Sequence, residues 1–155
     1  MTTSPVALRV TQHSLAVPIL VGGFVAGLLD MTSAYLTFGR FMPLGIAGGL
    51  IGAAARHPAA GPYVLGLLLH YFIAFSAAAV YCIASRKLRF LRESFFVCGL
   101  FYGIAVFLVM NLVVLPLSAY HAMGPYTYQG LVQGLLVHMF LIGLPISTSL
   151  RMLSK

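Results

Sequence analysis

Four long apolar runs alternate with short polar or basic segments along the chain. Each run is longer than the ~20 residues that an α-helix needs to cross a bilayer, so the pattern predicts four membrane-spanning helices. We expect them at residues 15–38, 62–84, 94–117 and 129–150. Because short segments join consecutive spans, the predicted fold is an all-α polytopic bundle of four transmembrane helices.

A fifth, shorter apolar stretch covers residues 43–55, between the first two runs. It is rich in glycine and alanine, and Pro43 suits the first position of a helix. At ~1.5 Å of rise per residue, this stretch is too short to cross a bilayer. We therefore expect a re-entrant or interfacial helix that packs on the bundle through its glycines.

The composition excludes an ordinary soluble protein. The chain is 61% hydrophobic and only 7% charged, whereas a soluble protein carries about 25% charged residues. Its 155 residues are enough for one domain, so we expect a single membrane domain over residues 1–155. The first run is too long for the apolar core of a signal peptide and should remain as a span.

The basic residues predict the orientation of the bundle, because Lys and Arg accumulate on the cytoplasmic side of a membrane. The more basic side carries Arg9, Arg86, Lys87, Arg89, Arg92, Arg151 and Lys155. The other side carries only Arg40 and Arg56. This bias predicts that both termini are cytoplasmic. The net charge of +7 does not indicate a nucleic-acid partner, because the sequence offers no continuous basic face.

Small residues and prolines predict how the spans pack. Three pairs of glycines, each four residues apart, mark faces on which helix backbones can approach closely. These pairs are Gly23 and Gly27, Gly99 and Gly103, and Gly130 and Gly134. Pro116 and Pro145 lie inside or near the ends of their spans and should kink them, since each removes a backbone hydrogen bond.

Strongly polar side chains interrupt each span once, at Asp30, His70, Asn111 and His138. At ~1.5 Å per residue, these four lie in one layer roughly 6 Å thick, in the outer half of the membrane. Gln133 lies nearer the outer end of the last span. An acid that faced lipid would cost on the order of 3 kcal/mol, so Asp30 needs a partner or a proton. We expect it to contact at least one of His70, Asn111 and His138.

Two interpretations of this polar layer stay open. Polar side chains often hold membrane helices together, so the layer can be purely structural and join the helices by hydrogen bonds. An ionisable residue within a span is also a default candidate for a functional site, which favours a role for Asp30 in proton or solute handling.

The sequence contains no motif of a soluble enzyme, such as a phosphate-binding loop, HExxH, CxxC or GxSxG. The two acids, Asp30 and Glu93, are predicted on opposite sides of the bundle, which excludes paired-carboxylate catalysis. Cys82 and Cys98 fall within apolar runs and should be buried thiols. We therefore expect no metal and no cofactor.

The segments LLLHYFIAFSAAAVY, MNLVVLPLSAY and LVHMFLIGLPI resemble an uncharacterised family of small bacterial inner-membrane proteins. These segments contain His70, Asn111, Pro116, His138 and Pro145. The resemblance implies a bacterial cytoplasmic membrane and a four-helix core, and it implies no catalytic activity.

Three functional hypotheses follow from these patterns. The first is a small transport or proton-handling protein that uses Asp30 and the histidines. The second is a structural or accessory subunit of a membrane complex, in which the polar layer only holds the helices together. The third is a b-type haem protein with His70 and His138 as axial ligands. Enzymes of lipid-like substrates are a remaining alternative. The expected partners are the lipid bilayer and either a second copy of the chain or another membrane protein.

Overall fold

The structure is a computed structural model that describes residues 14–56, 59–121 and 127–154. Four helical segments are long and apolar enough to cross a membrane, and a shorter apolar helix follows the first. No strand occurs among the described residues. The predicted fold class is therefore confirmed, and the ends of the spans differ from the predicted ends by at most three residues.

The first two spans are single helices, α1 (Ala16–Phe38) and α3 (Ala60–Ala84). The third consists of α5 (Phe95–Val109), the π-helix η2 (Met110–Val114) and α6 (Leu115–Leu117). The fourth consists of α7 (Tyr128–Val137), the π-helix η3 (His138–Gly143) and α8 (Leu144–Leu153). The shorter helices are α2 (Met42–Ile51), the 3₁₀-helix η1 (Gly52–Arg56) and α4 (Phe90–Glu93).

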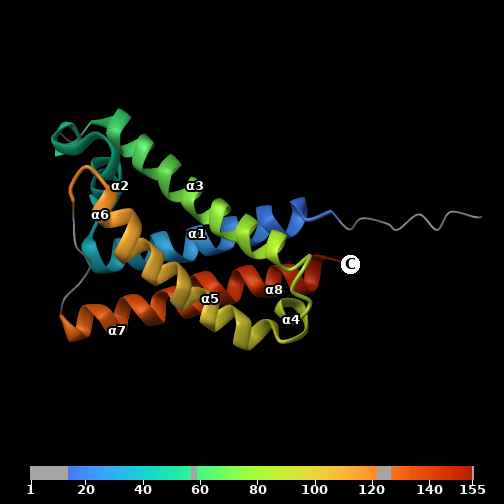
Figure 1. The fold of residues 1–155 in the computed structure, drawn as a ribbon. Coiled ribbons are helices and arrows are strands. Elements are labelled where there is room, and N and C mark those ends of the chain that lie inside the picture. The colour runs from blue at the N-terminus through green and yellow to red at the C-terminus, as the bar shows by residue number, and fades with distance from the viewer. Residues whose placement is uncertain (1–13, 57–58, 122–126, 155) are drawn as a thin grey trace, which may run out of the picture.

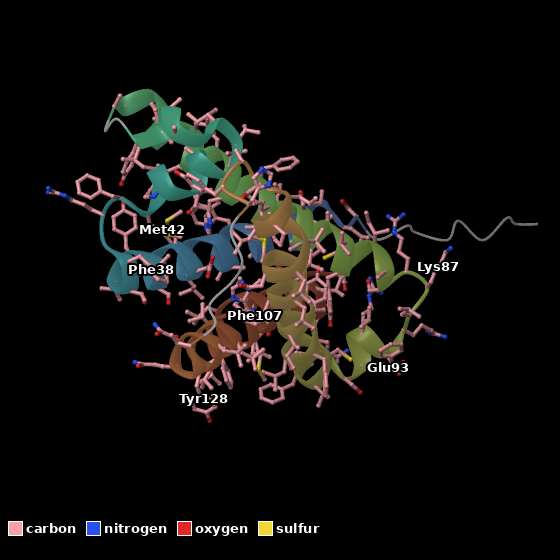
Figure 2. All side chains as sticks on the ribbon, turned by 60° about the vertical axis from the view of Figure 1, so that its left-hand side comes forward. Phe38, Met42, Lys87, Glu93, Phe107 and Tyr128 are labelled. Atoms are coloured by element: carbon pink, nitrogen blue, oxygen red, sulfur yellow. The ribbon has the colours of Figure 1, made fainter. Side chains whose placement is uncertain are left out.

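Figure 1 shows that α1 begins, and α8 ends, at the same end of the bundle, beside α4. We call this the terminal end. The opposite end, where α2 and α6 lie, we call the loop end. The side chains labelled in Figure 2 mark the two ends, with Phe38 and Tyr128 at the loop end and Lys87 and Glu93 at the terminal end. Helix α1 packs against α3 on one side and against η3 and α8 on the other.

Large apolar side chains cover the outside of all four spans. Leu20, Leu68, Phe101 and Phe140 are between 47% and 66% exposed, and similar residues surround them along each helix. A soluble protein rarely exposes so much contiguous apolar surface, whereas lipid covers it without cost. The chain is a multi-pass membrane protein.

Glycines let the third and fourth spans touch through their backbones. A Cβ atom at Gly103 would overlap the carbonyl oxygen of His138, and one at Gly143 would overlap that of Gly99. On the other side of the bundle, a Cβ atom at Gly27 would lie 2.9 Å from the Tyr71 ring, and Gly23 faces Phe75. These glycines lie where two helices come into close contact.

The last predicted glycine pair, Gly130 and Gly134, lies closer to the loop end. The two glycines have different surroundings. Gly134 faces the ring of Phe107, 2.7 Å from where its Cβ atom would lie. Gly130 is in the first turn of α7, where its N–H donates to the Thr127 hydroxyl.

Pro116 and Pro145, the two prolines predicted to kink their spans, each follow a π-helical turn. The N–H of Leu115, just before Pro116, donates to the carbonyl of Met110, five residues earlier. The N–H of Leu144, just before Pro145, donates to Met139 in the same way. A proline ring clashes with the carbonyl four residues before it, and the wider π-turn gives that carbonyl room. The structure thus places a π-helical turn where we predicted a simple kink.

The buried core lies towards the terminal end. It combines Ala26, Tyr81, Ile142, Ile146 and Leu150, which come from three of the four spans. The Tyr102 hydroxyl donates to the Ala77 carbonyl at 2.7 Å, and the Tyr81 hydroxyl donates to the Leu91 carbonyl at 2.9 Å. A buried tyrosine needs such a partner for its hydroxyl.

Helix α2 packs against the first half of α3 at the loop end. The backbone of Pro43 lies so close to α3 that a Cβ atom added at Gly66 would overlap the Pro43 carbonyl oxygen. The N–H of Ala119, which follows α6, donates to the carbonyl of Gly49 at 2.7 Å. These contacts attach α2 to both the second and the third span.

Candidate functional site

Asp30 lies in the middle of α1, on the side that faces α3. Gly27 is one turn before it and brings the two helix backbones together. The only other acid in the sequence, Glu93, is in α4 at the terminal end. Asp30 is therefore the one carboxyl group within the four spans, and its side chain is 23% exposed.

His70 of α3 binds α1 through one ring nitrogen and faces Asp30 with the other. Its Nε2 atom lies 2.8 Å from the Gly27 carbonyl oxygen, and its Nδ1 atom lies 3.9 Å from Asp30 Oδ2. The His70 side chain is only 11% exposed. The structure thus brings together Asp30 and His70, two of the residues that the sequence placed in one polar layer.

This geometry fixes which nitrogen of His70 carries a proton. A carbonyl oxygen only accepts hydrogen bonds, so Nε2 is the donor to Gly27 and keeps its hydrogen. Nδ1 then faces the carboxyl group, and it is bare in a neutral ring and protonated in an imidazolium.

The Asp30–His70 pair therefore has two states without net charge. In one, a neutral carboxylic acid faces a neutral imidazole. In the other, a carboxylate faces an imidazolium. The two states differ only in the position of one proton between Oδ2 and Nδ1. A separation of 3.9 Å is too long for a direct hydrogen bond, so transfer needs a water molecule or a shift of about 1 Å.

His138 comes from the fourth span, at the start of the π-helical turn η3. Its Nδ1 atom lies 2.8 Å from the Gly134 carbonyl oxygen, which makes Nδ1 the donor and leaves Nε2 as an acceptor. The ring stands edge-on to Phe107, with the ring centroids 5.3 Å apart. Figure 2 shows Phe107 midway between the two ends of the bundle.

The two amides of the predicted layer have other partners. Asn111 donates to the Phe107 carbonyl within its own helix, at 2.9 Å. Gln133 donates to the Thr37 hydroxyl at 3.0 Å and so links α7 to the loop end of α1. Gln133 therefore joins the span that carries Asp30, whereas Asn111 satisfies a carbonyl beside the π-helical turn η2.

An aromatic row lies on the terminal-end side of the pair. Tyr71 stands edge-on to His70 at 5.5 Å, stacks on Phe24 at 5.9 Å and packs beside Phe75 at 6.2 Å. Phe24 precedes Asp30, and Phe75 follows His70, towards the terminal end, so these rings lie on the terminal-end side of the pair, with Phe24 exposed on the outside of the bundle.

The histidine geometry does not match a pair of haem ligands. An axial imidazole needs one free nitrogen aimed into a slot, and His70 has Nε2 on the Gly27 carbonyl and Nδ1 facing Asp30. The backbones around Gly27 and Gly103 are also in close contact with their neighbours. Among the described residues, no three His, Cys, Asp or Glu side chains gather as metal ligands would.

Sequence reasoning missed polar contacts between the spans that lie away from the Asp30–His70 pair. The Ser149 hydroxyl donates to the Pro18 carbonyl at 2.9 Å, beside the close approach of α8 to Gly22. A hydroxyl group in an apolar span needs a hydrogen-bond acceptor, so the presence of Ser149 and Tyr102 within spans could have predicted such contacts.

Comparison of the chain with family models, with curated proteins and with solved structures found no match.

Proposed function

We propose that this chain moves protons, alone or coupled to a small solute, through the Asp30–His70 pair. The observation that carries the proposal is a carboxyl group 3.9 Å from an imidazole, between two otherwise apolar spans. Proton relays within membranes are built from such acids and histidines. The pair exchanges one proton without creating net charge in a medium of low dielectric constant, where an isolated charge is costly.

The loop end is the proposed entrance for the proton. Asp30 is more exposed than His70, and Thr37 and Gln133 supply exposed polar groups between Asp30 and the loop end. His138, with Nε2 free to accept, is the proposed next site for the proton.

The buried core lies between the pair and the terminal end, so full passage needs a second packing arrangement. The π-helical turn η3 begins at His138, and such turns often occur at functional sites. We place the rearrangement at η3.

The chain is, in this proposal, a bacterial inner-membrane protein with both termini in the cytoplasm. The terminal end carries most of the Lys and Arg residues, which supports this orientation. Reporter fusions test it: a periplasmic reporter should be inactive at Leu91 and Lys155 and active at Met123. Activity at Leu91 would reverse the orientation.

A single bundle of four helices is too narrow for a wide aqueous pore. We therefore propose that transport uses a homo-oligomer, whose interface would lie on the apolar outside of the spans. Light scattering of the purified protein in detergent should give a mass of at least two copies.

Proton flux into liposomes tests the proposal directly. Protein reconstituted into vesicles that hold a pH-sensitive dye should carry protons down an imposed gradient. Asp30→Asn and His70→Gln should each reduce the flux to the level of empty vesicles, because both remove a proton-binding atom. Glu93→Gln is the matched control, since it removes the other carboxyl group, and it should keep the wild-type flux. Equal flux in the wild type and in Asp30→Asn would reject the proposal.

An accessory subunit is the second candidate, and one observation favours it. His70 and His138 each bind a backbone carbonyl, which is a structural use of the ring. In that case the wild type would show no flux in vesicles, and His70→Gln would lower the melting temperature. The flux measurement and the melting temperature together separate the two candidates.

A further inference from the structure

A cavity opens at the terminal end of the bundle, far from the Asp30–His70 pair. It measures about 510 Å³ and is lined by Arg92, Arg151, Met152 and Ser154. This volume is typical of a small-ligand site. Arg92 comes from α4, Arg151 and Met152 come from the end of α8, and Ser154 directly follows α8, so two regions distant in sequence build the cavity.

The cavity is positively charged, and the described residues hold no carboxylate within 4 Å of either guanidinium group. The whole chain contains only two acids, one of which is Asp30 in the middle of α1. The other, Glu93, is exposed beside Arg92 in sequence, but it does not pair with either arginine. Two arginines facing one cavity repel each other unless an anion lies between them.

The Nε atom of Arg92 is buried and has no hydrogen-bond partner among the described residues. A guanidinium group carries five N–H donors in a planar fork, which matches two oxygens of a phosphate. Buried unsatisfied donors are rare in proteins, because each costs about 1–3 kcal/mol. The Nε atom itself is out of reach of the cavity, so a ligand there would meet the other N–H donors of the same guanidinium group.

The position of the cavity and the residues that line it suit a lipid headgroup. α4 and the end of α8 lie where the spans end (Figure 1). In a bilayer, the ends of the spans reach the level of the lipid headgroups. Met152 lines the cavity and is 64% exposed, so it offers an apolar contact next to the two charges. Basic pockets between membrane helices at this depth bind anionic headgroups.

We propose that Arg92 and Arg151 bind the phosphate of one anionic phospholipid, whose acyl chains lie along Met152 and the adjacent span. Ser154 lines the same cavity and can donate to a phosphate oxygen through its hydroxyl. The bound lipid would join α4 to α8, and so attach the turn between the second and third spans to the end of the fourth. This site is independent of the proton-handling proposal.

Lipid titration of the purified full-length protein tests the site. The protein in zwitterionic detergent is titrated with phosphatidylglycerol or with phosphatidylcholine of the same acyl chains, and bound lipid is counted by native mass spectrometry. We expect one phosphatidylglycerol to bind at least about tenfold more tightly than phosphatidylcholine. Arg92→Gln and Arg151→Gln should each weaken phosphatidylglycerol binding by at least about fivefold, as each removes one charge near the headgroup.

Arg89→Gln is the matched control, because Arg89 precedes α4 but does not line the cavity. It should bind phosphatidylglycerol as the wild type does, and circular dichroism should show that every variant is folded. If an arginine variant fails to fold, Arg92→Lys or Arg151→Lys takes its place and should still bind phosphatidylglycerol more weakly than the wild type, because lysine keeps the charge but lacks the planar fork.

Three results would overturn the proposal. The first is equal binding of the two lipids, and the second is equal weakening by Arg89→Gln and Arg92→Gln. The third is inorganic phosphate or glycerol phosphate that competes with phosphatidylglycerol at similar concentration, since the site would then hold a soluble anion. Failure of these tests would leave the liposome flux unaffected, and loss of flux would leave lipid binding unaffected.

Discussion

At the terminal end, Tyr81, Ile146 and Leu150 are at most 1% exposed, whereas α6 and α7 at the loop end contain no buried residue. The terminal half thus resembles the interior of a soluble bundle, with glycine contacts and tyrosine hydrogen bonds between helices. In the loop half, α2 packs closely on α3, with Pro43, Ala47 and Gly48 buried, but α6 and α7 are loosely packed and polar groups lie on the path to Asp30. The comparison teaches that the terminal half and the α2–α3 contact fix the fold, while the loosely packed ends of the last two spans leave polar groups beside an ionisable pair.

The largest expected effect concerns the glycines of the terminal half. Gly143→Ala places a Cβ atom where it overlaps the Gly99 carbonyl and contacts the Gly103 backbone. Backbone cannot move aside as a flexible side chain can, so we expect destabilisation of about 3 kcal/mol or more. Circular dichroism during denaturation in detergent measures the loss.

Gly45→Ala in α2 is the control from the loop end, where an added Cβ atom meets nothing within 4 Å. Alanine favours a helix by about 1 kcal/mol over glycine, so this variant should be as stable as the wild type or more stable. If both glycine variants lose stability equally, the contrast between the two halves is wrong.

A smaller effect is expected for Tyr102→Phe, which removes the hydrogen bond to the Ala77 carbonyl but keeps the ring packed on Tyr81, 4.9 Å away. We expect a loss of about 1 kcal/mol, the usual net value for a hydrogen bond. The melting temperature in detergent checks it. An unchanged melting temperature would mean that this bond does not hold the second and third spans together.

The smallest effect is expected for Gln133→Leu, which removes the bond to Thr37 at the loop end. Hydrogen bonds between membrane helices average ~0.6 kcal/mol, and both partners here are exposed, so the loss should not exceed that value. The same denaturation measurement applies. A loss larger than that of Tyr102→Phe would show that the loop half is held more firmly than its burial indicates.

The fold was predictable because its signals are strong and local. Four long apolar runs have one physical solution in a bilayer, and the glycine-rich stretch after Phe38 was too short to be a fifth span. The exact partners were not predictable. The spacing of Gly99 and Gly103 predicted a close helix contact, but the single Gly143 that faces them is not part of any spaced pair.

The polar layer was partly predictable in the same sense. Depth along each span placed Asp30 and His70 together, and the structure shows them 3.9 Å apart. The direction in which each side chain points depends on helix rotation, which depth does not determine. Asn111 lies in the π-helical turn η2 and bonds its own helix instead. A proline predicts a distorted helix, but sequence alone did not distinguish a π-turn from a kink.

The central claim is that Asp30 and His70 share one proton, and infrared titration of the carboxyl group tests it most directly. The absorption of the protonated Asp30 carboxyl is identified by its absence in Asp30→Asn and followed against pH in wild type and in His70→Gln. We predict that replacing His70 changes the titration of Asp30, because the carboxylate loses the imidazolium that faces it. Identical titration of Asp30 in the two proteins would contradict the claim.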